Sequence, residues 1–281
     1  MEEIIMESHG KVNLILDILY KRPDGYHEIN SIMQEISLKD RLKFKEIEKG
    51  MIIESNHPTM PRDSNNLIYK VWEKLSSLFG INKGIYVEVK KEIPMAAGLA
   101  GGSSNAAATL KALNELWDLK LSQEELIEIG MELGADIPFC LMGGTALVQG
   151  IGERLTKISP FSGKYLLLCK PHISISTAQA YRMISPGKDR LDIDKMIKCI
   201  EEGNIHCVAR RLGNKMEDVI IKEHPIIQEI KDIMETYGAL GALMSGSGPT
   251  VFGLYDDKDK MIFAQKKLLE KMNKVYICET I

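Results

Sequence analysis

Residues 94–116, PMAAGLAGGSSNAAATLKALNEL, carry the strongest functional signal of the chain. A proline, three glycines and two serines run directly into an alanine-rich stretch with a helical pattern. The glycines allow a backbone with φ > 0 that approaches a ligand closely. Ser103 and Ser104 place hydroxyls where the helix presents unpaired N–H groups and a partial positive charge, which suits a phosphate group. A tight turn with a serine N-cap is the alternative.

The loop is neither of the two best-known phosphate-binding loops. A Walker loop requires the pattern GxxxxGK[ST], and no lysine follows these glycines. A Rossmann fingerprint requires GxGxxG, which this stretch lacks. The local chemistry therefore leaves both the phosphate site and the plain turn open.

The composition predicts a folded protein and does not exclude small acidic substrates. Its 281 residues suffice for one large domain or two ordinary ones. Hydrophobic residues make up 44% and charged residues 27%, so the chain can bury a core. The net charge of -3 and the lack of a basic stripe argue against a nucleic-acid partner.

The predicted location is the cytoplasm. The N-terminal segment, MEEIIMESHG, is acidic and lacks the features of a secretion signal. No apolar run reaches membrane-spanning length, so no membrane partner is expected. The five cysteines form no CxxC pair and no zinc-spaced cluster, so we expect most of them to be reduced thiols in the core.

The pattern of the chain predicts an α+β protein. Alternation of polar and apolar residues predicts one long strand or two before a Pro-Asp-Gly turn, and two more strands after it. Helices are predicted over 64–80 and, from a capping box at Ser122 and Glu125, up to Gly134. The end of the chain is predicted as helix, strand, glycine turn, strand, helix and strand, which suits a small sheet with helices on one face.

Three further segments are candidates for chemistry, although each has a local explanation. Lys11 lies on a predicted strand, where a lysine is usually solvated. Asp136 follows a helix that ends at Gly134, and an aspartate there is suited to capping the next helix. The segment MSGSGPTVFGL, 244–254, contains the glycines of a tight turn between two strands.

Taken in chain order, these segments resemble the GHMP kinase superfamily, which phosphorylates galactose, homoserine, mevalonate and related alcohols. The matching segments are GKVNL at 10–14, the loop at 94–107, GADIPF at 134–139 and the glycine turn at 244–248. The superfamily loop contains a proline, a Gly-Leu pair and a Ser-Ser pair in this order, and these are matched by Pro94, Gly98, Leu99, Ser103 and Ser104. The hairpin RPDGYH resembles the branch whose acceptor is a methylerythritol linked to cytidine diphosphate, in the non-mevalonate route to isoprenoid precursors.

The resemblance implies a two-domain α+β fold. A ribosomal-protein-S5-domain-2-like domain with the ATP phosphate loop would occupy 1–157, and a ferredoxin-like domain would occupy 158–281. The implied activity is the ATP-dependent phosphorylation of the 2-hydroxyl of the cytidylated alcohol, with Mg²⁺ as cofactor. We expect a monomer or a homodimer.

The resemblance also implies roles for individual residues. Asp136 would be the base that accepts the proton of the attacking hydroxyl, and Lys11 would favour the alkoxide. Ser103 or Ser104 would be a candidate Mg²⁺ or phosphate contact. The implied ATP-binding residues are Pro94, Met95, Ala96, Ala97, Gly98, Leu99, Ala100, Gly101, Gly102, Ser103, Ser104 and Asn105, together with Asn66 and Lys91. Asn66 is equally suited to capping a helix.

The implied acceptor-binding residues are Asn13, Tyr26, His27, Thr177 and Tyr181. Tyr26 and Tyr181 would stack on the two faces of the cytosine ring, and His27 would hydrogen-bond to its edge.

Three alanines depart from the glycines that some relatives carry in the loop. They are Ala96, Ala97 and Ala100. We expect φ < 0 at all three, because φ > 0 costs an alanine about 1–2 kcal/mol.

Other functions stay open on the sequence alone. Another GHMP member, such as a different small-alcohol kinase or a diphosphomevalonate decarboxylase, would use the same loop. A nucleotide-binding regulator would keep the fold and lose the base, whereas both Lys11 and Asp136 are present here. Turnover of cytidylated against plain alcohols separates the enzymes.

Overall fold

Two long strands begin the chain in the computed structural model, which describes residues 3–184, 186–187 and 189–281. β1 (Glu3–Lys21) is one strand, and β2 (His27–Ile47) joins into one strand the two that the sequence predicts. The Pro-Asp-Gly turn between them is confirmed, because Gly25 has φ 90° and its N–H donates to the Arg22 carbonyl at 3.1 Å.

The chain divides into two compact units, each built from several segments. The first unit contains the described residues before Lys11, together with 39–95 and 100–142. The second unit contains 11–38, 96–99 and the described residues from Gly143 to Ile281. These units differ in extent from the domains 1–157 and 158–281, which stay a prediction.

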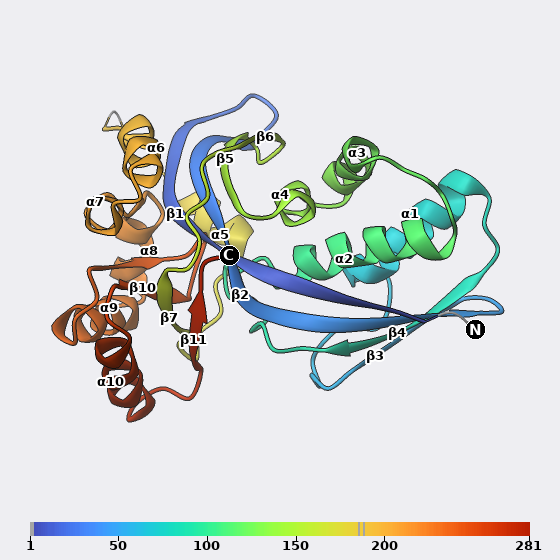
Figure 1. Ribbon diagram of the computed structural model, residues 1–281. Coiled ribbons are helices and arrows are strands. Elements are labelled where there is room, and N and C mark those ends of the chain that lie inside the picture. The colour runs from blue at the N-terminus through green and yellow to red at the C-terminus, as the bar shows by residue number, and fades with distance from the viewer. Residues whose placement is uncertain (1–2, 185, 188) are drawn as a thin grey trace. The chain divides into compact units, whose positions relative to one another are not determined.

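In the first unit, helices cover one face of a sheet (Figure 1). β4 pairs antiparallel with the part of β2 from Arg41 to Ile47 and parallel with β3, and β2 is flanked by β1. Besides the parts of β1 and β2, the elements are β3 (Met51–Ser55), α1 (Leu67–Phe79), β4 (Gly84–Lys90), α2 (Gly101–Leu116), α3 (Gln123–Leu133) and α4 (Ile137–Met142).

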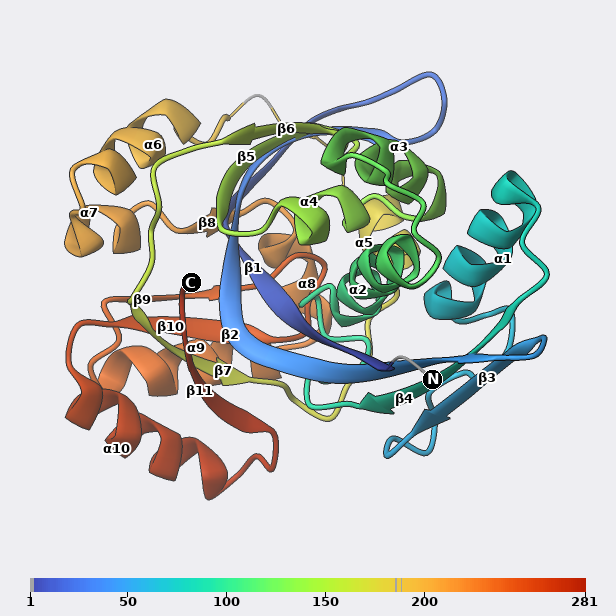
Figure 2. The ribbon, with the colours of Figure 1, turned by 45° about the vertical axis from the view of Figure 1, so that its right-hand side comes forward.

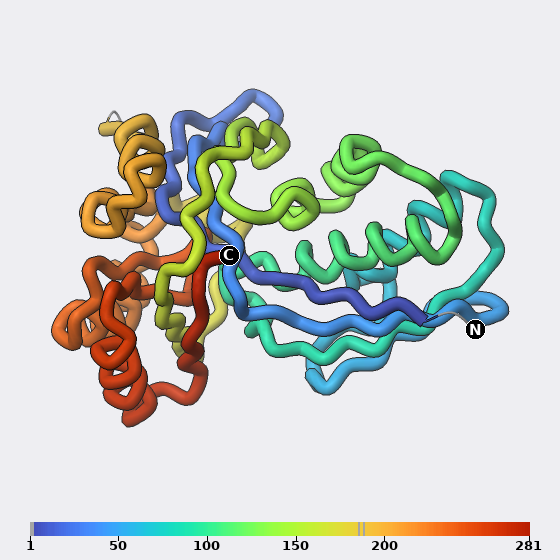
Figure 3. Tube along the Cα trace, viewed as in Figure 1, coloured from blue at the N-terminus to red at the C-terminus, as the bar shows by residue number. Residues whose placement is uncertain are grey.

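The core of the first unit lies between the sheet and these helices. Phe44 and Val87 of the sheet are fully buried in one cluster with Ile68 and Leu110 of the helices. α1 runs beside α2, as the tube in Figure 3 shows from the same side. The predicted helix ends are confirmed, because Gly80 ends α1 with φ 64° and both hydrogen bonds of the capping box begin α3. The sheet and helices thus hold the start of α2, where the glycine loop ends.

The second unit contains the remaining part of the first sheet and a separate four-stranded sheet. Strands β5 and β6 form a hairpin beside β2, and β8 pairs parallel with β1 (Figure 2). The elements of the second unit, besides its parts of β1 and β2, are β5 (Thr145–Gly150), β6 (Arg154–Lys157), β7 (Tyr165–Cys169), α5 (Thr177–Met183), α6 (Ile193–Glu201), α7 (Ile205–Ala209), β8 (Gly213–Asn214), α8 (Glu217–Glu223), α9 (Ile226–Thr236), β9 (Gly241–Met244), β10 (Val251–Tyr255), α10 (Lys258–Leu269) and β11 (Val275–Glu279).

The four-stranded sheet has the expected ferredoxin-like topology. Its strand order is β11-β7-β10-β9 with every neighbouring pair antiparallel. Helix α9 precedes β9, and α10 lies between β10 and β11, as the sequence predicts. Both helices pack on the sheet (Figure 1). The two strands that frame the glycine turn, β9 and β10, therefore lie next to each other, which fixes the ends of that turn.

The expectation of reduced thiols is wrong for two cysteines. Cys199 of α6 and Cys207 of α7 form a disulfide with their Cα atoms 5.4 Å apart. The chain turns back between the two helices at Gly203, which has φ 62° and brings together cysteines eight residues apart. Cys169 and Cys278 are buried thiols, as expected, and burial raises the pKa of each to about 12.

Candidate active site

The backbone of the glycine loop differs from the expectation at two of its three alanines. Ala97 keeps φ < 0, but Ala96 has φ 48° and Ala100 has φ 55°. Together with Gly98 at φ 74°, every second residue from 96 to 100 is left-handed. Such alternation turns successive N–H groups toward one side and makes a concavity that binds anions. The prediction was wrong because it considered only the intrinsic cost of φ > 0 for an alanine. It did not consider the backbone conformation that the rest of the loop imposes on these residues.

Helix α2 begins directly after this loop without a side-chain cap among the described residues. Ala100 occupies the N-cap position, and Ser103 and Ser104 lie inside the first turn. The serine N-cap of the plain-turn alternative is therefore absent at this helix start in the described chain. The first N–H groups of a helix have no acceptor within the helix, so they stay available to an anion.

In the second unit, the glycine turn between β9 and β10 packs directly on the loop. Ser245 Oγ donates to the Gly98 carbonyl at 3.0 Å. A Cβ atom added to Gly98 would lie 2.2 Å from the Ser245 carbonyl, so only glycine fits there. Asn214 Nδ2 donates to the carbonyls of Met244 and Gly246, each at 2.8 Å, and so fixes the turn from the other side.

Lys11 is buried on β1 rather than solvated. Its side chain lies beside the same two loops, in the second unit. Its N–H donates to the Leu99 carbonyl at 3.1 Å, and its ammonium donates to Asn13 Oδ1 at 2.7 Å. A Cβ atom added to Gly246 would lie 3.3 Å from Lys11 Nζ. The lysine therefore connects the phosphate loop, the glycine turn and Asn13.

In the first unit, a buried carboxylate that sequence reasoning missed organises two of the predicted ATP-binding residues. Asp40 Oδ2 contacts the ammonium of Lys91 and accepts from Asn105 Nδ2 at 2.8 Å. Asp40 Oδ1 accepts from the N–H groups of Glu92 and Ile93 at 2.7 and 2.8 Å. Burial lowers the pKa of Lys91, and the charge of Asp40 opposes that shift. No motif marks Asp40, because its role depends on where β2 passes in space.

Asn66 and Asp136 both lie at helix starts, as their local explanations predict. Asn66 Oδ1 accepts from the Ile68 N–H at 3.0 Å, and its Nδ2 donates to the Pro61 carbonyl at 2.7 Å. Asp136 is half-buried in the first unit and precedes α4, and its carbonyl accepts from the Cys140 N–H at 3.1 Å. The structure thus accounts for the local role of Asn66 in full, while its contact with ATP stays a prediction.

Four of the predicted acceptor residues come from the Pro-Asp-Gly turn between β1 and β2 and from α5, both in the second unit. His27 is buried and its ring stacks on Tyr181 at 5.2 Å between centroids and 24° between planes. Burial, and then the charge of Lys21, lower the pKa of His27. Tyr26 is 61% exposed on the same turn, and Thr177 Oγ1 lies 2.9 Å from Ser247 Oγ of the glycine turn. The turn and α5 therefore bring four of the five acceptor residues into one region of the second unit.

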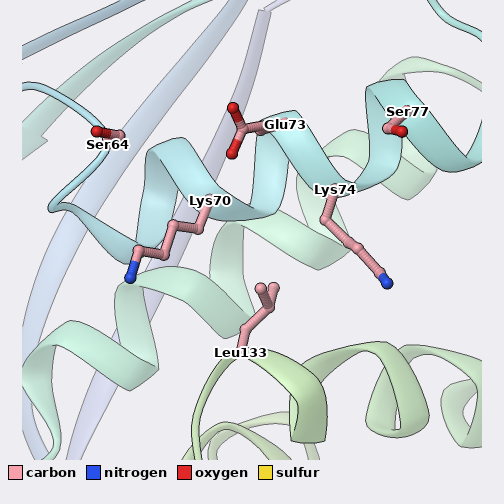
Figure 4. Close-up of a pocket in the computed structure, with 6 residues that line it drawn as sticks. All are labelled: Ser64, Lys70, Glu73, Lys74, Ser77 and Leu133. Atoms are coloured by element: carbon pink, nitrogen blue, oxygen red, sulfur yellow. The ribbon is translucent and has the colours of Figure 1, made fainter.

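A separate hollow of about 450 Å³ lies along α1 in the first unit (Figure 4). Its lining consists of Ser64, Lys70, Glu73, Lys74, Ser77 and Leu133. Lys74 is already paired with Glu132 at 2.6 Å. None of the predicted site residues is part of this lining, so we do not assign the hollow to the reaction.

Neither a membrane span nor a ready-made metal cluster is found in the part of the chain that the structure describes. None of the helices within 3–184, 186–187 and 189–281 is both long and apolar enough to cross a membrane. Among the same residues, no three histidine, cysteine, aspartate or glutamate side chains come together around a common point.

Comparisons with known proteins show the family to which the chain belongs. The family described as "GHMP kinases N terminal domain" matches residues 66–144, and "GHMP kinases C terminal" matches residues 196–274. The fold and the glycine loop are those of a GHMP kinase. The solved mevalonate kinase of Methanococcus jannaschii has the same fold, with a TM-score of 0.75 and 18% identity over 100% of this chain and 99% of that one.

Closer relatives narrow the family. A 4-diphosphocytidyl-2-C-methyl-D-erythritol kinase of Alkaliphilus oremlandii is 45% identical, covering 100% of this chain and 97% of that protein. The enzyme of the same name from Clostridium kluyveri is 42% identical over 99% of this chain and 100% of its own length. A crystal structure of 4-(cytidine 5'-diphospho)-2C-methyl-D-erythritol kinase matches at TM-score 0.85 and 28% identity over 99% of both chains. The chain belongs to the 4-diphosphocytidyl-2-C-methyl-D-erythritol kinase family.

Proposed function

We propose that this chain transfers the γ-phosphoryl group of ATP to the 2-hydroxyl of 4-diphosphocytidyl-2-C-methyl-D-erythritol. The products are the 2-phosphate and ADP, in the methylerythritol phosphate pathway of isoprenoid precursor biosynthesis. The kinase class follows from the family, since full-length relatives above 40% identity carry that name. One observation supports the phosphate chemistry above all others: the left-handed residues at 96, 98 and 100 lead into a helix without a side-chain cap in the described chain.

The ATP phosphates would bind to the N–H groups of the loop and of the first turn of α2. The loop is Pro94 to Ser104, with Asn105 following it, and Lys91 and Asn66 would lie nearer the nucleoside. Lys91 and Asn105 share the carboxylate of Asp40, so we assign them to shaping the nucleotide site rather than to neutralising phosphate charge.

Mg²⁺ would accompany ATP. This ion is usually held by substrate phosphates, water and one or two protein oxygens, so it needs no cluster of protein ligands. The hydroxyl of Ser103, which is half-buried in the first turn of α2, is suited to supply such an oxygen. The ion would neutralise charge on the transferred phosphoryl group.

The remaining chemistry is deprotonation of the acceptor hydroxyl. Asp136 would accept that proton, and Lys11 would stabilise the negative charge that develops on the oxygen. Both assignments rest on the motifs that these residues share with the family. The buried ammonium of Lys11, beside the Gly98 and Gly246 segments, supports its share of the proposal.

The cytidine would be recognised by Tyr26, His27 and Tyr181, with Asn13 and Thr177 closer to the alcohol. A base has a flat face for stacking on the exposed ring of Tyr26 or on the ring pair of His27 and Tyr181. We place the enzyme in the cytoplasm as a monomer or homodimer. A disulfide such as Cys199–Cys207 is uncommon in that compartment.

An ADP-release assay tests the proposal. Purified protein with Mg·ATP should turn over 4-diphosphocytidyl-2-C-methyl-D-erythritol, and the same alcohol carrying only a phosphate should be a poor substrate. Tyr26→Ala should raise KM for the cytidylated acceptor and leave KM for ATP almost unchanged. Phe263→Ala removes an exposed aromatic ring from α10 and serves as the matched control. Equal turnover of the two acceptors would reject recognition of the cytidine.

A further inference from the structure

A chain of three buried side chains connects Lys11 to the neighbouring strand. Lys11 Nζ donates to Asn13 Oδ1 at 2.7 Å, and Asn13 Nδ2 donates to Ser31 Oγ at 2.9 Å. Ser31 Oγ in turn lies 2.7 Å from the Ile15 carbonyl. Lys11, Asn13 and Ile15 alternate along β1 and so lie on one face of it, whereas Ser31 belongs to β2. All four residues are in the second unit, and Ser31 is fully buried.

The chemistry of these groups allows one direction for each hydrogen bond. The Ile15 carbonyl is only an acceptor, so the single hydroxyl proton of Ser31 goes to it. Ser31 Oγ can then only accept from Asn13, which turns the NH₂ end of the amide toward β2. The oxygen end of the amide must therefore face Lys11, whose ammonium is only a donor.

We propose that Ser31 is a positioning residue that sets the orientation of the Asn13 amide and, through it, the place of the Lys11 ammonium. The proposal rests on the proposed role of Lys11 at the acceptor hydroxyl. Without the Ser31 hydroxyl, the Asn13 NH₂ group loses its acceptor in a buried place, and the amide is free to rotate. A rotated amide would present NH₂ to an ammonium that cannot accept a hydrogen bond, so the ammonium would move.

The chain offers a control for the loss of a buried hydroxyl. Thr145 is buried in the second unit, and its Oγ1 donates to Gln34 Oε1 at 2.6 Å and accepts from the Phe161 N–H at 2.9 Å. Thr145→Val therefore removes two buried hydrogen bonds from β5 without touching the Lys11 chain. Its thermal stability should fall at least as far as that of Ser31→Ala, while its kcat should stay unchanged.

The kinetic test uses Ser31→Ala, Ser31→Thr and Lys11→Met. A displaced catalytic group costs up to about 100-fold, so we expect Ser31→Ala to lower kcat by about 10- to 100-fold with KM for ATP unchanged. Ser31→Thr keeps the hydroxyl and should restore kcat. In a Lys11→Met background, Ser31→Ala should cause no further loss, because both changes act on one group. Unchanged kcat in Ser31→Ala, or an equal further loss without Lys11, would overturn the proposal.

A second measurement is independent of turnover. The side-chain NMR signal of Lys11, assigned by its loss in Lys11→Met, should shift in Ser31→Ala and stay in place in Thr145→Val. If the wild-type protein turns over no cytidylated acceptor, the proposed function fails, while this signal still decides whether Ser31 positions Lys11. If Ser31→Ala does not fold, Ser31→Cys, with its weak sulfur acceptor, should give the same shift. A Lys11 signal that Ser31 does not affect would overturn the proposal.

Discussion

Ala96 and Ala97 are neighbours in the loop, yet replacing each with glycine should change stability in opposite directions. Ala96 has φ 48° and is exposed, so Ala96→Gly relieves a left-handed alanine and loses no packing. The relief is worth about 1–2 kcal/mol. Glycine also gains freedom in the unfolded chain, which costs about 0.4–1 kcal/mol. The midpoints leave a net stabilisation of about 0.8 kcal/mol.

Ala97→Gly relieves no backbone strain, and it costs both unfolded-state entropy and the packing of a buried methyl group. Its φ is not positive, and its side chain is only 3% exposed. The unfolded-state cost of about 0.7 kcal/mol adds to about 0.8 kcal/mol for the lost buried methyl group. Ala97→Gly should therefore destabilise the protein by about 1.5 kcal/mol. Since both sites are in the second unit, the same folding transition serves for both.

Thermal unfolding followed by circular dichroism measures both variants against the wild type. A change of 1 kcal/mol moves the midpoint by about 2–4 °C in proteins of nearly this size. We expect the midpoint to rise by about 2–3 °C for Ala96→Gly and to fall by about 3–6 °C for Ala97→Gly. If Ala96→Gly lowers the midpoint as much as Ala97→Gly does, the loop is not strained at Ala96 and the anion-binding backbone described above is wrong.

Three other predictions concern the reaction, the loop and pH. Asp136→Asn should lower kcat by about 10²–10⁴-fold while ATP binding, measured by calorimetry, stays nearly intact; near wild-type turnover would remove Asp136 as the base. Gly101→Val should abolish ATP binding, because an added Cβ would lie 2.9 Å from both Ile93 Cγ2 and Lys91 Nζ, whereas the Cβ added in Gly102→Val would meet only Leu67 Cδ1 at 4.0 Å and should perturb ATP affinity far less. Similar affinities for the two variants would contradict this. The pKa of His27 in the folded protein lies below its ordinary value of 6.5, so the unfolded chain binds the proton more tightly than the folded chain does. The free energy of unfolding should therefore fall as pH is lowered through 6.5 toward the folded pKa. Urea titrations of the wild type and His27→Gln should differ in this slope, and identical slopes would count against it.

Local rules predicted the helix ends and the strand pattern well. Asn66 and Gly80 bound α1, and Ser122 begins α3, because a cap needs only residues that are close in sequence. The order of elements after Pro225 is also as predicted, since each short apolar run there is separated by glycine or polar residues. The family motifs then located the loop without any structural information.

The parts that sequence missed depend on contacts between distant segments. The disulfide of Cys199 and Cys207 requires a turn between two helices, and the carboxylate of Asp40 acts on residues more than 50 positions away. Intrinsic preference gave the wrong sign of φ at Ala96 and Ala100, because the demands of the loop override an alanine's preference. Such sites are where local rules are expected to fail, since function competes there with stability.

The second unit fixes its part of the phosphate loop through a closed ring of contacts that begins and ends on β1. Leu16 of β1 is paired with Asn214 of β8, and Asn214 holds the carbonyl of Gly246. The turn that contains Gly246 holds Gly98 through Ser245, and the residue after Gly98 accepts from the N–H of Lys11, back on β1.

Because both faces of β1 are buried between Lys11 and Ile18, a slip of one residue would exchange its polar and apolar sides. The register of this one strand therefore sets where Lys11 lies relative to Gly98 and the glycine turn, which explains how segments more than 200 residues apart hold one loop in a strained conformation.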